Sequence, residues 1–348
     1  MVRHTSVKMH NIDVFLVIAY SVIVPLNLMG NILVFLVVRF NRSMKTPMNF
    51  LLVNLAVADM VVAIFLLPSN VFFHLFNHPN GKAGDYLCKF LTAGNVMWIG
   101  GNASGSTLVA IALERYFAIL LPYSTHAKKA KKKVNSIILS CWLFGVIANI
   151  PLFVVTVYDK DSNTCRESWK KDNILAKLYP FVWFLCGVGA PLLIMIVLYA
   201  KIGRRLWAKE TRSTQAPQIA ILLYRKHVTK ILLLVTIAYG VFWLPNPLVY
   251  IMVYNSPYLK YGSSLYRVTI LLSCLGSSLN PFIYSLNSEK FRKHSKDIIC
   301  CFRNRRRVTT LEEVIRRSPI PMIHYVNKMQ TECTETLDVT NLRINKFL

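Results

Sequence analysis

The chain has 348 residues, of which 54% are hydrophobic and 16% are charged. Soluble domains have about 25% charged residues, so this composition excludes an ordinary soluble enzyme, a disordered chain and a collagen-like fibre, and it indicates a membrane protein. Lysine and arginine number 41 against 16 acidic residues, and the net charge of +25 would favour nucleic-acid binding in a soluble protein but indicates basic cytoplasmic loops in a membrane protein.

Seven segments between residues 14 and 288 are long and apolar enough to cross a bilayer, for which a helix needs about 20 apolar residues. Six of them contain no acidic or basic residue, and the second contains only Asp59. They are too long and too continuously apolar for barrel strands, so the sequence predicts an all-α membrane protein, a seven-transmembrane helix bundle. The segments are residues 14–38, 48–73, 90–113, 134–158, 178–200, 231–259 and 268–288.

The basic residues predict the orientation of these segments. If residues 1–13 lie outside the cell, the inner loops and the C-terminal tail hold 30 of the 41 lysines and arginines. Cytoplasmic loops are enriched in these residues, so we expect an extracellular N-terminus and a multi-pass protein of the plasma membrane. The densest cluster, residues 128–133, could be a nucleic-acid patch, but its position beside a span favours anionic lipid, and we expect no nucleic-acid partner.

The tail begins with residues 289–302, in which apolar residues such as Phe291 and Ile298 alternate with charged ones at helical spacing. This pattern predicts a short amphipathic eighth helix on the membrane surface. Cys300 and Cys301 at its end are candidates for palmitoylation, and the alternative is two reduced cytosolic thiols. Residues 303–348 are polar and predict a disordered cytoplasmic tail with phosphorylation sites.

Polar residues also occur within the spans, where an ionisable side chain is costly and by default indicates function. Asp59 is the only acidic residue in the middle of a span. Hydrogen bonding between helices is the alternative interpretation for each of the others, which are Asn31, Asn54, Ser104, Ser277, Ser278 and Asn280.

Short motifs lie on successive spans. They are Gly30-Asn31, residues 54–59 (NLAVAD), Glu114-Arg115-Tyr116, Trp142, Pro191 with Tyr199, Trp243-Leu244-Pro245, and Asn280-Pro281-Phe282-Ile283-Tyr284 followed by Phe291. In this combination and order the chain resembles the rhodopsin-like class of G-protein-coupled receptors over nearly its whole length.

The resemblance implies a switch for G-protein coupling. Arg115 would pair with Glu114 at rest and turn toward two tyrosines in the active form. Trp243 would lie beneath a ligand pocket, and Pro245 would be the hinge of the sixth span. The implied switch residues are Glu114, Arg115, Tyr116, Tyr199, Trp243, Pro245, Asn280, Pro281 and Tyr284.

The resemblance also implies an allosteric sodium ion, and we expect no other cofactor. Its ligands would be Asp59, Ser104, Ser277 and Asn280. Members of the family often have an asparagine where this chain has Gly276, so one polar partner is missing.

Cys88 and Cys165 are the two cysteines expected on the outer side, where thiols become oxidised. The family has a disulfide at these positions, which would fix the second outer loop over the bundle. Residues 153–169 predict a β-hairpin with its turn at residues 159–163. Within it, residues 165–169 (CRESW) resemble the Cys-x-Glu-x-Trp of neuropeptide receptors, and the alternative is an ordinary lid with a chance match.

The residues present disfavour two ligand classes. Retinal requires a lysine in the seventh span, where Cys274 holds the matching position, and amine receptors use an aspartate in the third span, which has no acid. Cys88 precedes Arg115 by 27 residues, two more than is usual, so the pocket-facing residues beyond Ser104 stay open. The candidate ligand-binding residues, each of which could instead serve only in packing, are Met97, Trp98, Glu167, Trp169, Trp183, Asn246 and Tyr250.

We therefore expect a receptor, and not an enzyme, that binds an extracellular neuropeptide and signals through heterotrimeric G proteins, with arrestin and receptor kinases acting on the tail. The alternatives are a receptor of the same class for a small non-amine ligand and a seven-helix transporter or channel. A transporter is expected to have internal repeats and several ionisable groups at the midplane, where this chain has only Asp59.

Overall fold

The computed structural model describes residues 11–72, 78–121, 133–169, 174–210, 216–287, 289 and 291–300. The chain divides into two compact units, one comprising Met1–Phe35 with Thr46–Tyr284 and the other Leu36–Lys45 with Ser285–Leu348. The expected N-terminus before Asn11, the basic cluster at 128–132, Cys301 and the tail from 303 onward lie outside the described residues.

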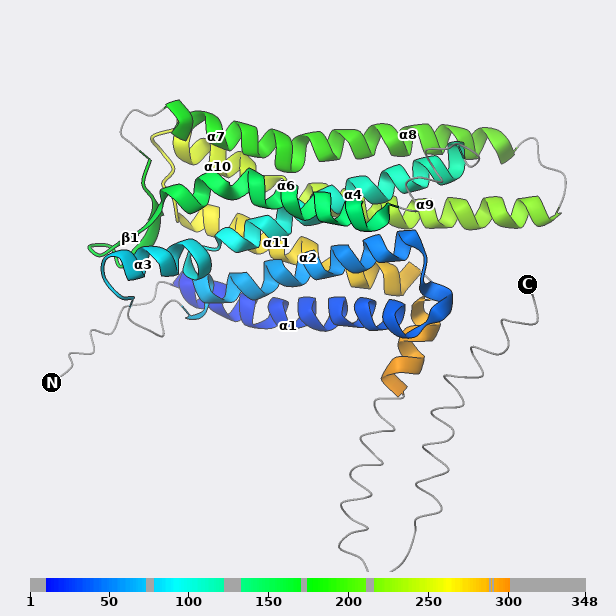
Figure 1. Cartoon of the computed structure of the whole chain (residues 1–348), viewed down its shortest axis with the longest axis horizontal. Coiled ribbons are helices and arrows are strands. Elements are labelled where there is room, and N and C mark those ends of the chain that lie inside the picture. The colour runs from blue at the N-terminus through cyan, green and yellow to red at the C-terminus, as the bar shows by residue number, and fades with distance from the viewer. Residues whose placement is uncertain are drawn as a thin grey trace, which may run out of the picture. The chain divides into compact units, whose positions relative to one another are not determined.

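Seven helical segments are long and apolar enough to span a membrane, which confirms the predicted bundle. Figure 1 shows them running alongside one another, with a β-hairpin at one end of the bundle. The helices are α1 (Asn11–Phe40), α2 (Pro47–Asn70), α3 (Lys82–Leu87), α4 (Asn95–Leu120), α6 (Val134–Val155), α7 (Ile174–Phe184), α8 (Ala190–Glu210), α9 (Ala216–Trp243), α10 (Pro245–Asn255) and α11 (Ser264–Asn287).

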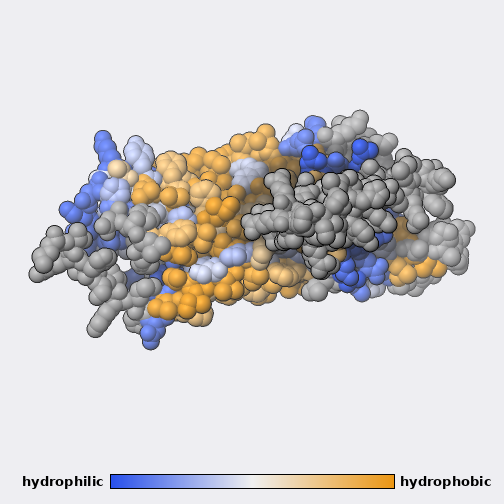
Figure 2. Space-filling view, turned by 90° about the horizontal axis from the view of Figure 1, so that it is seen from below, coloured by the Kyte–Doolittle hydropathy of each residue, from blue (hydrophilic) through white to orange (hydrophobic). Residues whose placement is uncertain are grey.

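The outward-facing side chains of the spans are apolar. Figure 2 shows a broad hydrophobic band across the middle of one face, with hydrophilic residues toward both ends. Ile18, Ile147 and Leu193 are each about 60% exposed, although an apolar surface of this extent would make a soluble protein aggregate. These side chains are therefore positioned to contact lipid, as expected of a multi-pass membrane protein.

The third span packs closely against its neighbours because small residues lie at the contacts. A Cβ atom on Gly100 of α4 would come within 2.9 Å of the Ala58 carbonyl oxygen on α2. A Cβ atom on Gly145 of α6 would come within 2.7 Å of the Ile99 carbonyl oxygen on α4. Glycine at such positions allows the backbones of membrane helices to approach one another, and this places α4 in the interior of the bundle.

The third span, predicted for residues 90–113, is irregular toward the hairpin. A π-helical segment at Cys88–Thr92 follows α3, and Gly94, with φ of 79°, separates it from α4. Glycine adopts this left-handed conformation without the steric cost of a Cβ atom. The π-helical turn and the break accommodate the two additional residues between Cys88 and Arg115.

Prolines interrupt the fifth and sixth spans. A π-helical segment at Leu185–Gly189 joins α7 to α8, and Pro191 lies one residue beyond the start of α8. The sixth span is interrupted at Leu244, where α9 ends and α10 begins with Pro245. Both interruptions follow from the missing N–H group of proline and from the clash of its ring with the preceding turn.

The predicted hairpin is present but shorter than expected. Strands β1 (Thr156–Asp159) and β2 (Thr164–Glu167) pair antiparallel, with Tyr158 opposite Cys165. Residues 153–155 belong to α6. The strand was therefore predicted to begin about one helical turn too early, at residue 153, and the span to end about one turn too late, at residue 158. The β-branched and aromatic residues there continue the apolar face of the helix, and periodicity alone does not separate the two structures over so short a run.

The smaller unit contains a 3₁₀ turn at Arg42–Met44 and a helix over residues 291–300. Phe291, Ser295 and Ile298 are buried, whereas most of the residues between them are exposed. This spacing of four and three residues is that of an amphipathic helix, as predicted for residues 289–302. Cys300 at its described end is exposed.

Candidate functional site

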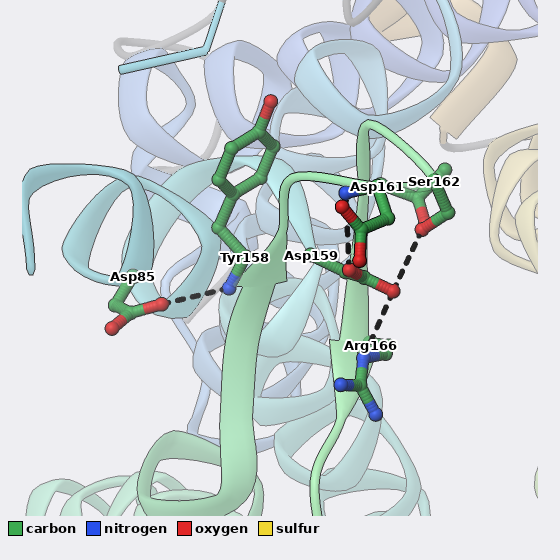
Figure 3. A network of polar contacts seen from close by, with 7 residues as sticks. Asp85, Tyr158, Asp159, Asp161, Ser162 and Arg166 are labelled. Carbon is green, nitrogen blue, oxygen red and sulfur yellow. Dashed lines mark hydrogen bonds and ion pairs between the residues drawn. The ribbon is translucent and has the colours of Figure 1, made fainter. Parts of the chain in front are cut away.

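The outer hairpin is fixed to the third span by a covalent bond and by polar contacts. Cys88 and Cys165 form a disulfide with their Cα atoms 5.6 Å apart, which confirms the predicted pairing. The backbone N–H of Tyr158 on β1 donates a hydrogen bond of 2.8 Å to Asp85 on α3 (Figure 3). The ion pair between Arg166 and Asp159, at 3.1 Å, joins the two strands (Figure 3). The hairpin is thereby held at its base and across its width.

The disulfide determines where Glu167 lies. Successive residues of a strand point to opposite faces, so Glu167 shares the less exposed face of β2 with Cys165. One oxygen of its carboxylate, Oε2, accepts hydrogen bonds from Tyr254 Oη (2.6 Å), Tyr250 Oη (2.8 Å) and Trp169 Nε1 (2.9 Å). Burial raises the pKa of Glu167 above its ordinary value, and these three hydrogen bonds act in the opposite direction.

Aromatic rings surround this carboxylate. Tyr250 packs edge to face against Tyr254, with ring centroids 5.3 Å apart, and against Trp183, at 6.3 Å. Trp183 in turn packs edge to face against Trp98, at 5.2 Å. In such edge-to-face pairs the positive edge of one ring lies against the negative face of the next, which holds the rings around the carboxylate in fixed relative orientations.

A small cavity lies beside the carboxylate. It is lined by Trp98, Leu152, Glu167, Trp183, Asn246, Tyr250 and Tyr266. Five of these residues are among the seven predicted ligand-binding residues. In this conformation the cavity is far smaller than the roughly 300 to 1,000 Å³ of pockets that enclose a drug-sized ligand, because the aromatic side chains fill most of the space.

The remaining candidates occupy other positions. Met97 is buried but does not line the cavity, because it lies beside Trp98 on α4 and consecutive residues of a helix point in different directions. Trp169 contacts Glu167 from the rim and lies against the Tyr179 ring. Sequence reasoning missed Leu152, which nothing distinguishes from other apolar residues of its span, and Tyr266, which precedes the predicted start of the seventh span at residue 268.

Trp243 lies deeper in the bundle and packs on glycines. A Cβ atom on Gly101 would come within 2.5 Å of its ring. A Cβ atom on Gly276 would come within 2.7 Å of Phe242 and 3.3 Å of Trp243. The absence of a side chain at position 276, where the family often has asparagine, therefore leaves room for the sixth span against the seventh.

Asp59 lies fully buried between three spans. Its two carboxylate oxygens accept hydrogen bonds from Ser104 Oγ (2.9 Å) and from Asn280 Nδ2 (2.7 Å). Ser277, one turn before Asn280, is also buried. A carboxylate, two hydroxyls and an amide are oxygen ligands of the kind that hard cations prefer, and each carboxylate oxygen keeps a second lone pair.

Arg115 and Glu114 form an ion pair toward the end of α4 opposite the hairpin. Arg115 Nε and Nη2 both lie 2.5 Å from Glu114 Oε2. Tyr199 and Tyr284 are buried, and the Tyr284 hydroxyl has no hydrogen-bond partner among the described residues. Tyr116 packs edge to face on Phe117, and Pro281 fits against Gly30. Arg115 thus has the pairing that the resemblance implies for the resting form.

Comparison with known proteins agrees with this arrangement. The model of the family described as "7 transmembrane receptor (rhodopsin family)" matches residues 30–284. The chain is 27% identical to a QRFP-like peptide receptor of Branchiostoma floridae, over 82% of this chain and 77% of that protein. It is 28% identical to neuropeptide FF receptor 2 of Rattus norvegicus (80% and 71%) and 27% identical to an allatostatin-A receptor of Bombyx mori (79% and 76%).

Proposed function

Because the chain belongs to the rhodopsin family of seven-transmembrane receptors, we propose that it binds an extracellular peptide and activates heterotrimeric G proteins at the plasma membrane. Two relatives named as a peptide receptor and a neuropeptide receptor, and the hairpin carrying residues 165–169, support a peptide ligand over a small non-amine one. Its membership of a receptor family argues against the transporter alternative and against an enzyme.

The observation that carries the proposal is the buried carboxylate of Glu167. Among the residues that the structure describes, no lysine or arginine forms an ion pair with it, although a buried charge normally has a partner of opposite sign. The surrounding tyrosine and tryptophan rings would also attract a cation. A basic group of the ligand, such as an arginine side chain or a terminal amine, would complete this site.

The size of the cavity supports a particular mode of binding. The cavity is too small to enclose a whole peptide, so only one end of the ligand would enter between the aromatic side chains as they move apart. The rest of the ligand would lie on the hairpin, on which Lys160 and Arg166 are exposed. The pocket residues of this proposal are Met97, Trp98, Glu167, Trp169, Trp183, Asn246 and Tyr250, with Leu152 and Tyr266 added.

The outer end of the bundle is the one that carries the disulfide. A disulfide persists in the oxidising extracellular space, and most basic residues lie toward the opposite ends of the spans. Both observations support an extracellular N-terminus. Arg115, released from Glu114, would then turn toward Tyr199 and Tyr284 at the cytoplasmic end and contact the G protein, while α9 swings about the break at Pro245.

Two regulatory sites belong to the same proposal. A sodium ion held by Asp59, Ser104, Ser277 and Asn280 would favour the resting form, because a ligand stabilises the state that it binds better. Palmitoylation of Cys300 would anchor the amphipathic helix to the membrane, and the tail would bind receptor kinases and arrestin.

The experiment that tests the function is nucleotide exchange on purified G proteins in membranes that contain the chain. A panel of short amidated peptides, with and without a basic residue near either end, is compared with a panel of small non-amine molecules. We expect exchange with basic peptides alone. Exchange with a small molecule and with no peptide would support the other receptor class, and ion current without G protein would support a channel.

A further inference from the structure

A buried hydrogen bond joins the sixth span to the fifth in the middle of the bundle. The hydroxyl of Tyr239 on α9 donates to the carbonyl oxygen of Gly187, with an oxygen–oxygen distance of 3.0 Å. Tyr239 is 4% exposed, and Gly187 is buried in the π-helical segment Leu185–Gly189. Neither residue lines the outer cavity or contacts Arg115, so the bond belongs to neither site described above.

The sequence explains why this carbonyl accepts a bond from another helix. In an α-helix the carbonyl of residue 187 would accept from the N–H of residue 191, and residue 191 is Pro191, which has none. A buried carbonyl deprived of its donor is costly. Tyr239 supplies a donor from the neighbouring span.

A glycine on the third span leaves room for the hydroxyl. A Cβ atom on Gly105 would collide with Tyr239 Oη and would lie 3.1 Å from Tyr239 Cζ. Tyr239 stacks on Trp243, with ring centroids 5.8 Å apart, and Trp243 lies against Gly101. The two glycines, four residues apart on one face of α4, thus form the surface on which the two rings lie.

We propose that Tyr239 is a positioning residue whose hydroxyl holds α9 against the fifth and third spans in the resting form. The break at Leu244 lies about one turn beyond Tyr239, so a swing of α9 about that break carries the hydroxyl away from Gly187. A hydrogen bond made only in the resting form favours that form. This inference rests on the proposed function, because it assigns the bond an effect on signalling.

Tyr239→Phe tests the proposal, because it removes one oxygen and keeps the ring. We expect ligand-free nucleotide exchange to rise about threefold to tenfold at matched surface expression, as loss of one neutral hydrogen bond gives, with agonist potency increased in parallel. Tyr86→Phe, at a tyrosine that is 62% exposed, is the matched control and should change neither value. A purely structural role would lower expression and signalling together, and unchanged or reduced basal exchange in Tyr239→Phe overturns the proposal.

A second variant tests the same contact from the third span. Gly105→Ala should displace the hydroxyl and raise basal exchange, and its effect should be smaller in the Tyr239→Phe background. Additive effects in this double-mutant cycle would mean that the two residues act independently and would contradict the proposal.

A conformational measurement separates this inference from the proposed function. Spin labels are attached to cysteines introduced at positions 113 on α4 and 223 on α9, which are 37% and 54% exposed. The exposed native thiols are replaced by serine. The labels then report the distance between these two helices. Tyr239→Phe should shift this distance distribution toward larger values without ligand or G protein. If the distance increases in Tyr239→Phe but the receptor activates no G protein, the proposed function is refuted and the role of Tyr239 stands. If the wild type signals but the distance is unchanged in Tyr239→Phe, only the role of Tyr239 is refuted.

Discussion

The disulfide and the Glu167 hydrogen bonds join segments far apart in the sequence, whereas the ion pair of Arg115, toward the opposite end of the bundle, joins adjacent residues. The disulfide spans 77 residues, and Glu167 binds tyrosines 83 and 87 residues away. Arg115 instead pairs with the adjacent Glu114, and the Thr229 hydroxyl donates to the Arg225 carbonyl of its own helix. Long-range contacts fix the relative positions of segments and local ones do not, so the Glu167 contacts connect the hairpin to the sixth span, whereas the Arg115–Glu114 pair connects no two spans.

Breaking the covalent link of the outer end should have the largest effect. Removing a native disulfide costs about 2 to 5 kcal/mol, and here it also releases the strand that carries Glu167. We expect Cys165→Ser to lose most surface expression or ligand response, measured by cell-surface labelling and calcium or cAMP reporters. Cys186→Ser removes a free, exposed thiol and should behave as wild type. Normal signalling by Cys165→Ser at normal surface levels would contradict the importance of the link.

Neutralising Glu167 tests the charge at the outer end while keeping the fold. Glu167→Gln keeps a hydrogen-bond acceptor for Tyr250 and Tyr254 but removes the negative charge. We expect the affinity for a basic peptide to fall about tenfold to a hundredfold, the range for a hydrogen bond to a charged group. The affinity for the same peptide with its basic residue replaced by a neutral one should be similar in the variant and the wild type, as measured by radioligand competition.

The pH dependence of binding sharpens this test. Burial raises the pKa of Glu167, so the carboxylate takes up a proton at a higher pH than an exposed glutamate does. The charged form binds the basic group, so peptide affinity should decrease as the extracellular pH falls through the pKa of the free receptor, by up to about tenfold per pH unit. The dependence should disappear in Glu167→Gln, and a wild-type affinity that rises on acidification would exclude Glu167 as the counter-ion.

Asp59 lies between the two ends and should connect them through sodium. Sodium bound at Asp59, Ser104, Ser277 and Asn280 would favour the resting form and lower agonist affinity, by about fivefold at saturating salt. Asp59→Asn should remove this effect when sodium is compared with potassium at equal ionic strength. Wild-type affinity that is already insensitive to sodium would mean that the missing side chain at Gly276 abolishes the site.

The smallest effect is expected at the inner end. Described residues 225–230, in the part of α9 remote from the hairpin, include Arg225, Lys226 and Lys230 but no acid that could restrain Arg115. We expect measurable ligand-free signalling that falls severalfold in Arg225→Glu, because a charge pair near the surface contributes about 1 kcal/mol or less. Lys160→Glu, the same charge reversal in the exposed outer turn, is the control. Equal basal signalling in Arg225→Glu and wild type, at matched expression, would mean that apolar packing alone holds the resting form.

The elements most evident in the sequence were those governed by the membrane. Uninterrupted apolar runs predicted all seven spans, because a bilayer forces the backbone to satisfy its own hydrogen bonds. The hairpin followed from its β-branched and turn-forming residues, the disulfide from the two outer cysteines and the family resemblance, and five of the cavity residues were among the predicted candidates. Element boundaries were harder to predict. The start of the hairpin was misplaced by about one turn, and the π-helical segments at 88–92 and 185–189 have no apolar periodicity of their own.

The side-chain partners of the site depended on three-dimensional packing. Nothing in the sequence indicates that Tyr250 and Tyr254 donate to Glu167, because this contact requires the sixth span and the hairpin to meet. Met97 was predicted for its type and proximity to Trp98, and its direction could only be known from the phase of α4 after the break at Gly94. The hydrogen bond from Tyr239 to the Gly187 carbonyl could in part have been predicted, because Pro191 leaves that carbonyl without its helical partner.

The break at Gly94 has a consequence for how such a protein can evolve. In a continuous helix each inserted residue rotates everything beyond it by about 100°, so an insertion near the ligand would turn the inner side chains away from their partners. A left-handed glycine ends the helical register, and α4 begins afresh at Asn95. Residues can therefore be gained or lost on the outer side, changing which ligand is recognised, while Asp59, Ser104 and Arg115 keep their mutual alignment.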